Sequence, residues 1–66
     1  MNIQINGESR TIEPMSLHEL LGTLDINPAR VAVERNRDIV PKREYETTLL
    51  TDGDIIEIVQ FVGGGL

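Results

Sequence analysis

The sequence predicts an α+β domain in which a mixed sheet of four to five strands packs on one short helix. Three observations support this: a hairpin signal near the start, one amphipathic helix with a strong start signal, and a long apolar strand before the C-terminus. Sixty-six residues allow one domain only. We expect that domain to span residues 1–62, with a flexible glycine tail at 63–66.

The first predicted feature is a β-hairpin. Ile3 and Ile5 alternate with polar residues, which is the pattern of a strand with one buried face. The dipeptide Asn6-Gly7 follows, and it favours a two-residue hairpin turn because both turn positions take positive φ. Residues 8–12 are therefore predicted to return as a second strand.

The second predicted feature is a short helix. Ser16 and Glu19 have the spacing of a capping box, in which each side chain bonds the other residue's backbone amide. Leucines then recur at helical spacing on one face: Leu17, Leu20, Leu21 and Leu24. Asn27-Pro28 ends the pattern. A helix this short is marginal alone, so we expect it to pack on the sheet.

The second half of the chain is again strand-like. Residues 31–34 alternate, 36–38 are polar and turn-forming, and 39–40 form a short strand that Pro41 closes. Because proline has no amide hydrogen, that strand is expected to be short or to lie at an edge. Lys42-Arg43 is interpreted as a solvated pair, with an acidic partner patch as the alternative.

The last strand is the longest one predicted, at residues 55–62, after a turn at 51–54. Residues 44–50 are ambiguous, with a turn of helix and Leu49 or Leu50 packed beneath it as one interpretation. If the first and last strands are parallel neighbours, the helix between them is a crossover that covers one face of the sheet. That arrangement is the β-grasp, or ubiquitin-like, fold.

Side-chain alternation assigns the two faces of this strand. Ile56 and Ile58 are predicted to face the helix, and Glu57, Val59 and Phe61 the opposite side. Two apolar residues beside a glutamate on the outer face predict a partner-binding patch. The alternative is that Val59 and Phe61 cover the edge of the sheet itself.

Composition excludes several classes of function. Eleven acidic against six basic residues give a net charge of -5, which disfavours nucleic acid as a partner. There is no cysteine, which fits a reducing cytoplasm, and no apolar run approaches the roughly 20 residues of a membrane span. His18 alone cannot form a zinc site, and turn formation accounts for Asp52 and Asp54, so we expect no metal and no bound cofactor. A deep catalytic cleft is hard to build from so short a chain, and we do not expect an enzyme.

Three consecutive glycines, Gly63, Gly64 and Gly65, follow the apolar strand abruptly. One interpretation is a frayed terminus. The other is a tail that extends into a channel too narrow for other side chains and presents a carboxyl group for activation.

Three segments resemble the ThiS family, the ubiquitin-like sulfur carriers of thiamin biosynthesis. They are 16–21 (SLHELL), 39–42 (IVPK) and 52–65 (DGDIIEIVQFVGGG). A diglycine ending alone is shared with ubiquitin and with MoaD, the carrier of molybdopterin synthase, whereas the other two segments are more specific. A MoaD-like carrier and a non-covalent β-grasp interaction module are the alternatives.

The resemblance implies a cytoplasmic carrier with a defined chemistry. A ThiF-like adenylating enzyme consumes ATP to adenylate Gly65, the tail being presented through Gly63 and Gly64. A sulfur-donor relay then converts Gly65 to a thiocarboxylate, which donates its sulfur to a ThiG-like thiazole synthase. Glu57, Val59 and Phe61 are the partner-binding patch expected beside this tail.

Leu66 departs from the family pattern, in which the chain usually ends at the glycine. With Leu66 attached, the Gly65 carbonyl is an amide and has no carboxylate oxygen to attack ATP. Three explanations stand: an appended linker or tag residue, a natural extension that a protease removes, or an inactive relative that binds without carrying.

Overall fold

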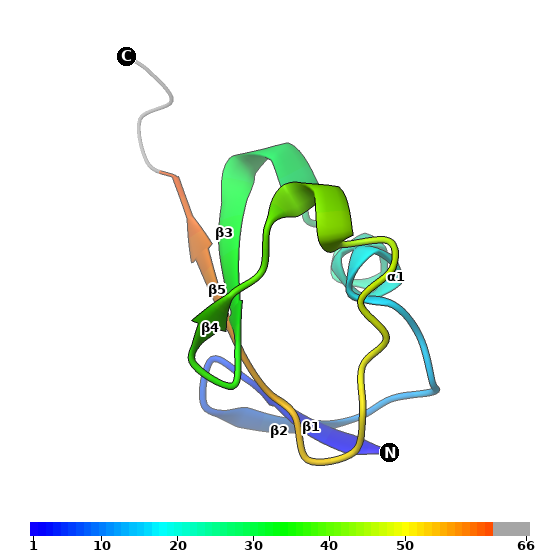
Figure 1. The fold of residues 1–66 in the computed structure, drawn as a ribbon. Helices are drawn as coiled ribbons and strands as arrows, with labels where there is room; N and C mark the ends of the chain where they lie inside the picture. The colour runs from blue at the N-terminus through cyan, green and yellow to red at the C-terminus, as the bar shows by residue number, and fades with distance from the viewer. Residues whose placement is uncertain (62–66) are drawn as a thin grey trace.

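The computed structural model describes residues 1–61 and confirms the predicted fold class (Figure 1). In chain order the elements are β1 (Asn2–Ile5), β2 (Glu8–Thr11), α1 (Leu17–Thr23), the 3₁₀ helix η1 (Pro28–Arg30), β3 (Val31–Arg35), β4 (Asp38–Ile39), the 3₁₀ helix η2 (Lys42–Glu44) and β5 (Ile55–Gln60). The five strands form one mixed sheet in the order β2-β1-β5-β3-β4. None of the helices in this part of the chain is long and apolar enough to cross a membrane.

The N-terminal hairpin forms as predicted. β1 and β2 pair antiparallel, with Ile5 opposite Glu8 at the turn. Asn6 has φ 49 and Gly7 has φ 84, so both turn residues take the left-handed conformation that the dipeptide favours. Every residue of β2 is exposed, as suits an edge strand.

The capping box also forms, and it fixes where α1 begins. The Ser16 amide donates to Glu19 Oε1 at 2.8 Å, and the Glu19 amide donates to Ser16 Oγ at 3.1 Å. Three of the four leucines of the predicted stripe are buried: Leu17, Leu20 and Leu21. Leu24 is the C-cap of the helix and is only partly buried, because the helix ends at Thr23.

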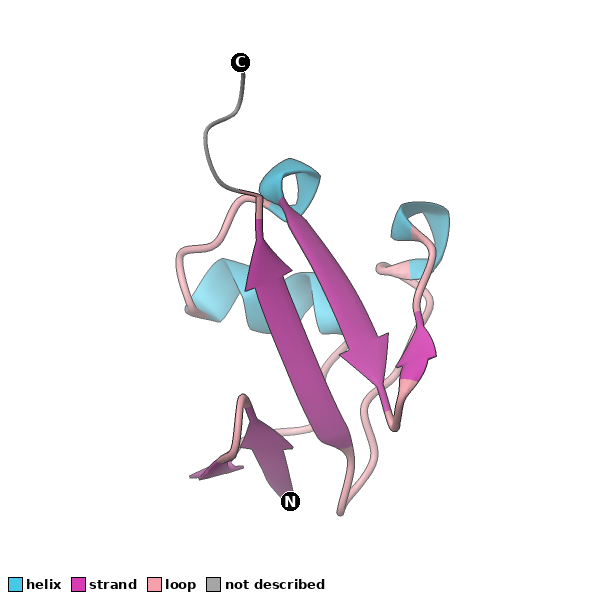
Figure 2. Cartoon of the chain, turned by 90° about the vertical axis from the view of Figure 1, so that its left-hand side faces the viewer, coloured by secondary structure: helices cyan, strands magenta, loops and turns pink. Residues whose placement is uncertain are grey.

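β5 is the central strand of the sheet. It pairs parallel with β1, where Ile5 lies opposite Ile56, and antiparallel with β3 over five residue pairs. The predicted parallel neighbours and helical crossover are therefore confirmed. Figure 2 looks onto the outer face of β3 and β5, and α1 lies behind them. The core between sheet and helix consists of Ile3, Ile5, Leu17, Leu20, Leu21, Val31, Val33, Val40, Tyr45, Leu50, Ile56 and Ile58.

β5 is shorter than the predicted strand at 55–62. It ends at Gln60, opposite Val31, because β3 begins at Val31 directly after η1. The Phe61 amide still donates to the Arg30 carbonyl at 2.9 Å, but Phe61 lies outside the strand. Val62 lies outside the described residues.

Most of the ambiguous segment at 44–50 is a loop, and the predicted turn of helix lies just before it in the chain. That turn is η2, and it starts at Lys42. Leu50 is buried and Leu49 is 67% exposed, so Leu50 is the packed leucine. Tyr45 joins the core, and burial raises the pKa of its phenol despite a hydrogen bond from the Val33 backbone.

A buried carboxylate ties the turn before β5 to the end of β3. Asp54 is 4% exposed and accepts hydrogen bonds from Arg35 Nε (2.9 Å), Asn36 Nδ2 (3.1 Å) and the Thr51 amide (2.9 Å). Burial alone raises the pKa of the Asp54 carboxyl. The bonds from the Thr51 amide, Asn36, Arg35 and the Thr51 hydroxyl outweigh it, and the pKa lies below its ordinary value. Asp52 Oδ1 accepts from the Asn2 amide, so the two aspartates also tie the turn to distant strands, a role beyond the turn formation that was predicted for them.

Candidate functional site

The candidate site lies at the C-terminal end of β5. The tail residues on which the predicted chemistry rests, Gly63, Gly64, Gly65 and Leu66, lie outside the described residues, so their roles stay predictions. The structure shows the platform from which this tail continues: a central strand hydrogen-bonded on both sides and anchored beneath by Ile56 and Ile58.

The face assignment of β5 is confirmed. Ile56 is fully buried and Ile58 nearly so, while Glu57 is exposed, Val59 is 60% exposed and Phe61 is 56% exposed. The last three residues therefore lie on the outer face, away from α1. Their role in binding a partner stays a prediction.

The Phe61 ring makes a cation–π contact with a lysine. Lys42 Nζ lies 5.2 Å from the centre of the Phe61 ring and also donates a hydrogen bond of 2.6 Å to the Val31 carbonyl. Lys42 and Arg43 are both exposed, as predicted for a solvated pair, and the Lys42 ammonium group in addition contacts the ring and the backbone. An ammonium over a ring face is attracted by the ring's quadrupole, which restrains the Phe61 side chain.

The outer face is larger than the sequence indicated. Ile55 is 45% exposed and Ile39, which lies opposite Glu34 in the β3–β4 pairing, is 73% exposed. Glu34 is itself opposite Glu57 in the β3–β5 pairing. Directly opposed residues share a face, so Ile39 and Glu34 belong to the same surface as Glu57. Sequence reasoning missed them because their register with β5 is set by pairing between distant segments.

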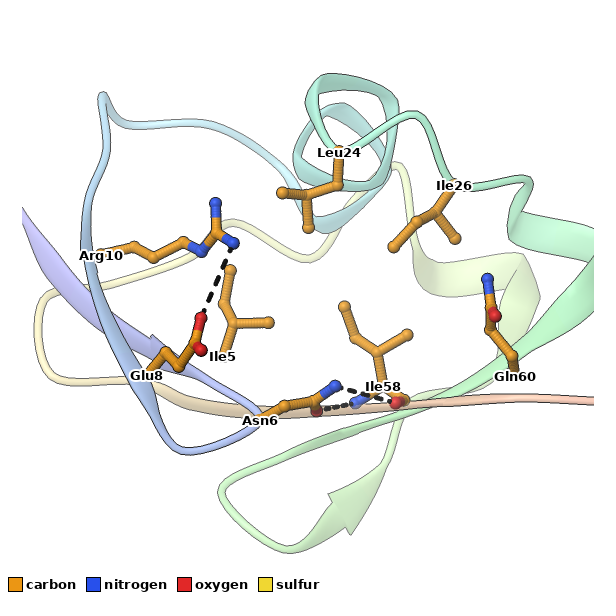
Figure 3. A pocket seen from close by; sticks show the side chains of 8 residues that line it. All are labelled: Ile5, Asn6, Glu8, Arg10, Leu24, Ile26, Ile58 and Gln60. Carbon is orange, nitrogen blue, oxygen red and sulfur yellow. Dashed lines mark hydrogen bonds and ion pairs between the residues drawn. The ribbon is translucent and has the colours of Figure 1, made fainter.

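A separate hollow of about 520 Å³ opens between the hairpin and the end of α1 (Figure 3). Ile5 and Ile58 lie on one side of it, and Leu24 and Ile26 on the other. Asn6 bridges the hairpin to β5, because its side chain donates to the Ile58 carbonyl at 3.2 Å and accepts from the Ile58 amide at 2.7 Å. The remaining residues that line the hollow are Glu8, Arg10 and Gln60.

In the part of the chain that the structure describes, no three His, Cys, Asp or Glu side chains come together as a metal site. His18 is exposed on α1. The arrangement is suited to presentation: a strand paired on both sides leads to a glycine-rich segment, beside an outer face that mixes apolar and acidic side chains.

A model of the ThiS family matches residues 3–65. The chain belongs to the ThiS family. The predicted β-grasp fold agrees with the crystal structure of the thiamine biosynthesis protein ThiS from Geobacter metallireducens. That structure is similar with a TM-score of 0.85 and 33% identity, over 98% of this chain and 100% of that one.

Two relatives of known sequence extend this comparison. Sulfur carrier protein ThiS of Bacillus subtilis is 44% identical over 50 residues, which cover 76% of each chain. A thiazole synthase of Paramagnetospirillum magneticum is 48% identical over 66 residues, which are 98% of this chain and 20% of that relative. The chain therefore spans about a fifth of that relative's length.

Proposed function

We propose that this protein is a sulfur carrier of thiamin biosynthesis, whose Gly65 carboxyl group is adenylated and converted to a thiocarboxylate. The observation that carries the proposal is the family match, which extends through Gly65 and so includes the complete glycine segment. The described fold supports it, since the strand that leads to this segment is the central strand of the sheet. The protein acts as a co-substrate rather than as an enzyme.

The chemistry proceeds in two displacements at the end of the tail. A carboxylate oxygen of Gly65 attacks the α-phosphorus of ATP, and pyrophosphate leaves. Hydrosulfide, the sulfur species supplied by the donor, then attacks the activated carbonyl carbon, AMP leaves with the original oxygen, and the thiocarboxylate remains. Glycine suits this role because the absence of a Cβ lets the nucleotide and the enzyme's backbone approach the carbonyl closely.

Two partners follow from this proposal. A ThiF-like enzyme supplies the ATP chemistry, and a thiazole synthase accepts the sulfur. The second partner is supported by relatives named thiazole synthase that contain a segment similar to the whole of this chain. In those proteins a carrier-like segment and a thiazole synthase are parts of one polypeptide.

Intact mass spectrometry tests the proposal. A chain ending at Gly65 is incubated with a ThiF-like enzyme, ATP and sulfide, and its mass is expected to rise by about 16 Da as sulfur replaces oxygen. A chain ending at Gly64 without Gly65 is the control for selectivity at the last residue. An unchanged mass of the Gly65-ended chain, with an enzyme proven active on its own carrier, would contradict the proposal.

A further inference from the structure

Lys42 makes two contacts at the place where the chain leaves the sheet. Its Nζ donates a hydrogen bond of 2.6 Å to the Val31 carbonyl and lies 5.2 Å from the centre of the Phe61 ring. Val31 is opposite Gln60, the last residue of β5, in the pairing of β3 with β5. One ammonium group therefore links the start of β3 to the first residue after β5.

Both partners of the cation–π contact extend from a backbone that is held in place. Lys42 begins η2 after Pro41, and its carbonyl accepts a hydrogen bond of 3.1 Å from the Tyr45 amide. Tyr45 is 2% exposed and belongs to the core, so η2 is anchored to the body of the domain. The Phe61 amide in turn donates to the Arg30 carbonyl at 2.9 Å.

No carboxylate among residues 1–61 forms an ion pair with this ammonium group. The ion pairs there are Arg35 with Asp54 and Arg10 with Glu8, although the chain has eleven acidic residues. The Phe61 side chain is 56% exposed, so packing alone leaves it room to change rotamer. An ammonium group over the ring face attracts the ring and favours one orientation of it.

The orientation of the chain at Phe61 limits where the reacting carboxyl group can be placed. Gly65 follows Phe61 by four residues. Four extended residues span at most about 14 Å, because each adds no more than about 3.6 Å. The direction in which the chain leaves Phe61 therefore restricts the region that the carboxyl group can reach before the enzyme binds.

We propose that Lys42 is a positioning residue for the adenylation of Gly65, which acts by holding the Phe61 ring in one orientation before the enzyme binds. The inference rests on the proposed function for the reaction that it serves. A carrier whose Phe61 is already restrained loses less conformational freedom on binding. Once the enzyme holds the carrier this restraint is no longer needed, so the KM for the carrier depends on Lys42 and kcat does not.

Proton NMR of the free protein tests the restraint without any enzyme. The protons on Cε of Lys42 are expected to be shifted upfield by the ring current of Phe61. Phe61→Leu keeps an apolar side chain but removes the ring, so it is expected to return these signals to their ordinary position. Unshifted Lys42 signals in the wild-type chain overturn the inference even when adenylation proceeds.

ATP–pyrophosphate exchange with a ThiF-like enzyme tests the consequence, with every chain ending at Gly65. Lys42→Met removes the charge and keeps an unbranched side chain, and it is expected to raise the KM for the carrier by about three- to fivefold while kcat stays within about 1.5-fold. Arg43→Met makes the same charge change at the next residue, which is also exposed. It is expected to leave both constants within about 1.5-fold.

A double-mutant cycle separates this role from a direct contact with the enzyme. In the Phe61→Leu background, Lys42→Met is expected to change the KM by less than about 1.5-fold, because no ring remains to be held. The same increase in KM in both backgrounds, an equal increase in Arg43→Met, or a loss of kcat at unchanged KM overturns the inference while exchange by the wild-type chain upholds the proposed function. A wild-type chain that supports no exchange, with an enzyme active on its own carrier, refutes the proposed function and this inference with it.

Discussion

The buried position of Ile56 and the exposed position of Phe61 predict losses of stability of different size for two truncations. Ile56 is fully buried, and Ile56→Ala removes three carbon atoms worth about 0.8 kcal/mol each. The cavity left behind raises the cost to about 3–4 kcal/mol. Phe61 is 56% exposed, so Phe61→Ala loses about 1 kcal/mol of burial and about 0.5–1 kcal/mol from the contact with Lys42.

Urea denaturation followed by circular dichroism measures both losses at pH 7. A 66-residue domain has a total stability of roughly 3–10 kcal/mol, so Ile56→Ala is expected to lower the midpoint severely and Phe61→Ala moderately. Affinity for the adenylating enzyme is expected to fall by about 1–3 kcal/mol in Phe61→Ala, the scale of an aromatic hot spot. Destabilisation by Phe61→Ala as large as that by Ile56→Ala would refute the assignment of faces.

Three further predictions concern the framework behind the site. The pKa of Asp54 is depressed from its ordinary 3.8, so its stabilisation is complete above that value and is lost as the pH falls through the folded pKa. Asp54→Asn is expected to cost about 2–4 kcal/mol at pH 7 and to flatten this acid limb in urea titrations from pH 2 to 7; an unchanged limb would refute the assignment. Ser16→Ala removes the helix cap and is expected to cost about 1–2 kcal/mol in the same assay, unlike Ser9→Ala on the exposed edge strand, and equal effects would contradict the role of the cap. Asn6→Ala removes both side-chain bonds to Ile58 and is expected to speed amide exchange at Ile58, measured by NMR, whereas unaltered exchange would show that the Asn6 bridge is not needed.

Local signals predicted most of the fold because they are encoded within a few residues. The Asn6-Gly7 turn and the Ser16–Glu19 capping box depend on neighbouring side chains and backbone angles, and both form as predicted. The predicted end of β5 was wrong by at least one residue, because the last paired residue of β5 depends on where β3 begins. That start is set by η1, which is capped by a hydrogen bond that the Ala29 amide donates to Asn27 Oδ1.

Features that join distant segments were not predictable from local pattern. The Asp54 hydrogen-bond network links residues up to 19 positions apart. In the sequence, nothing distinguishes Asp54 from an aspartate that only forms a turn. The exposure of Lys42 was predictable, but its contact with the Phe61 ring depends on the fold that brings the two residues together. The outward position of Val59 and Phe61 followed from strand alternation, but the opposition of Glu34 and Glu57 required the register.

ATP–pyrophosphate exchange with a ThiF-like enzyme tests the central claim most directly. Carrier chemistry requires a free carboxylate on Gly65 that reaches ATP through a passage tolerating only glycine-sized residues. The chain ending at Gly65 is therefore expected to support exchange. The chain ending at Leu66, and a Gly64→Val variant of the Gly65-ended chain, are expected to give none, because the first lacks the carboxylate and the second adds a β-branched side chain. Equal exchange by the Gly65-ended and Leu66-ended chains, or no exchange by any of the three with an enzyme active on its own carrier, would contradict the account.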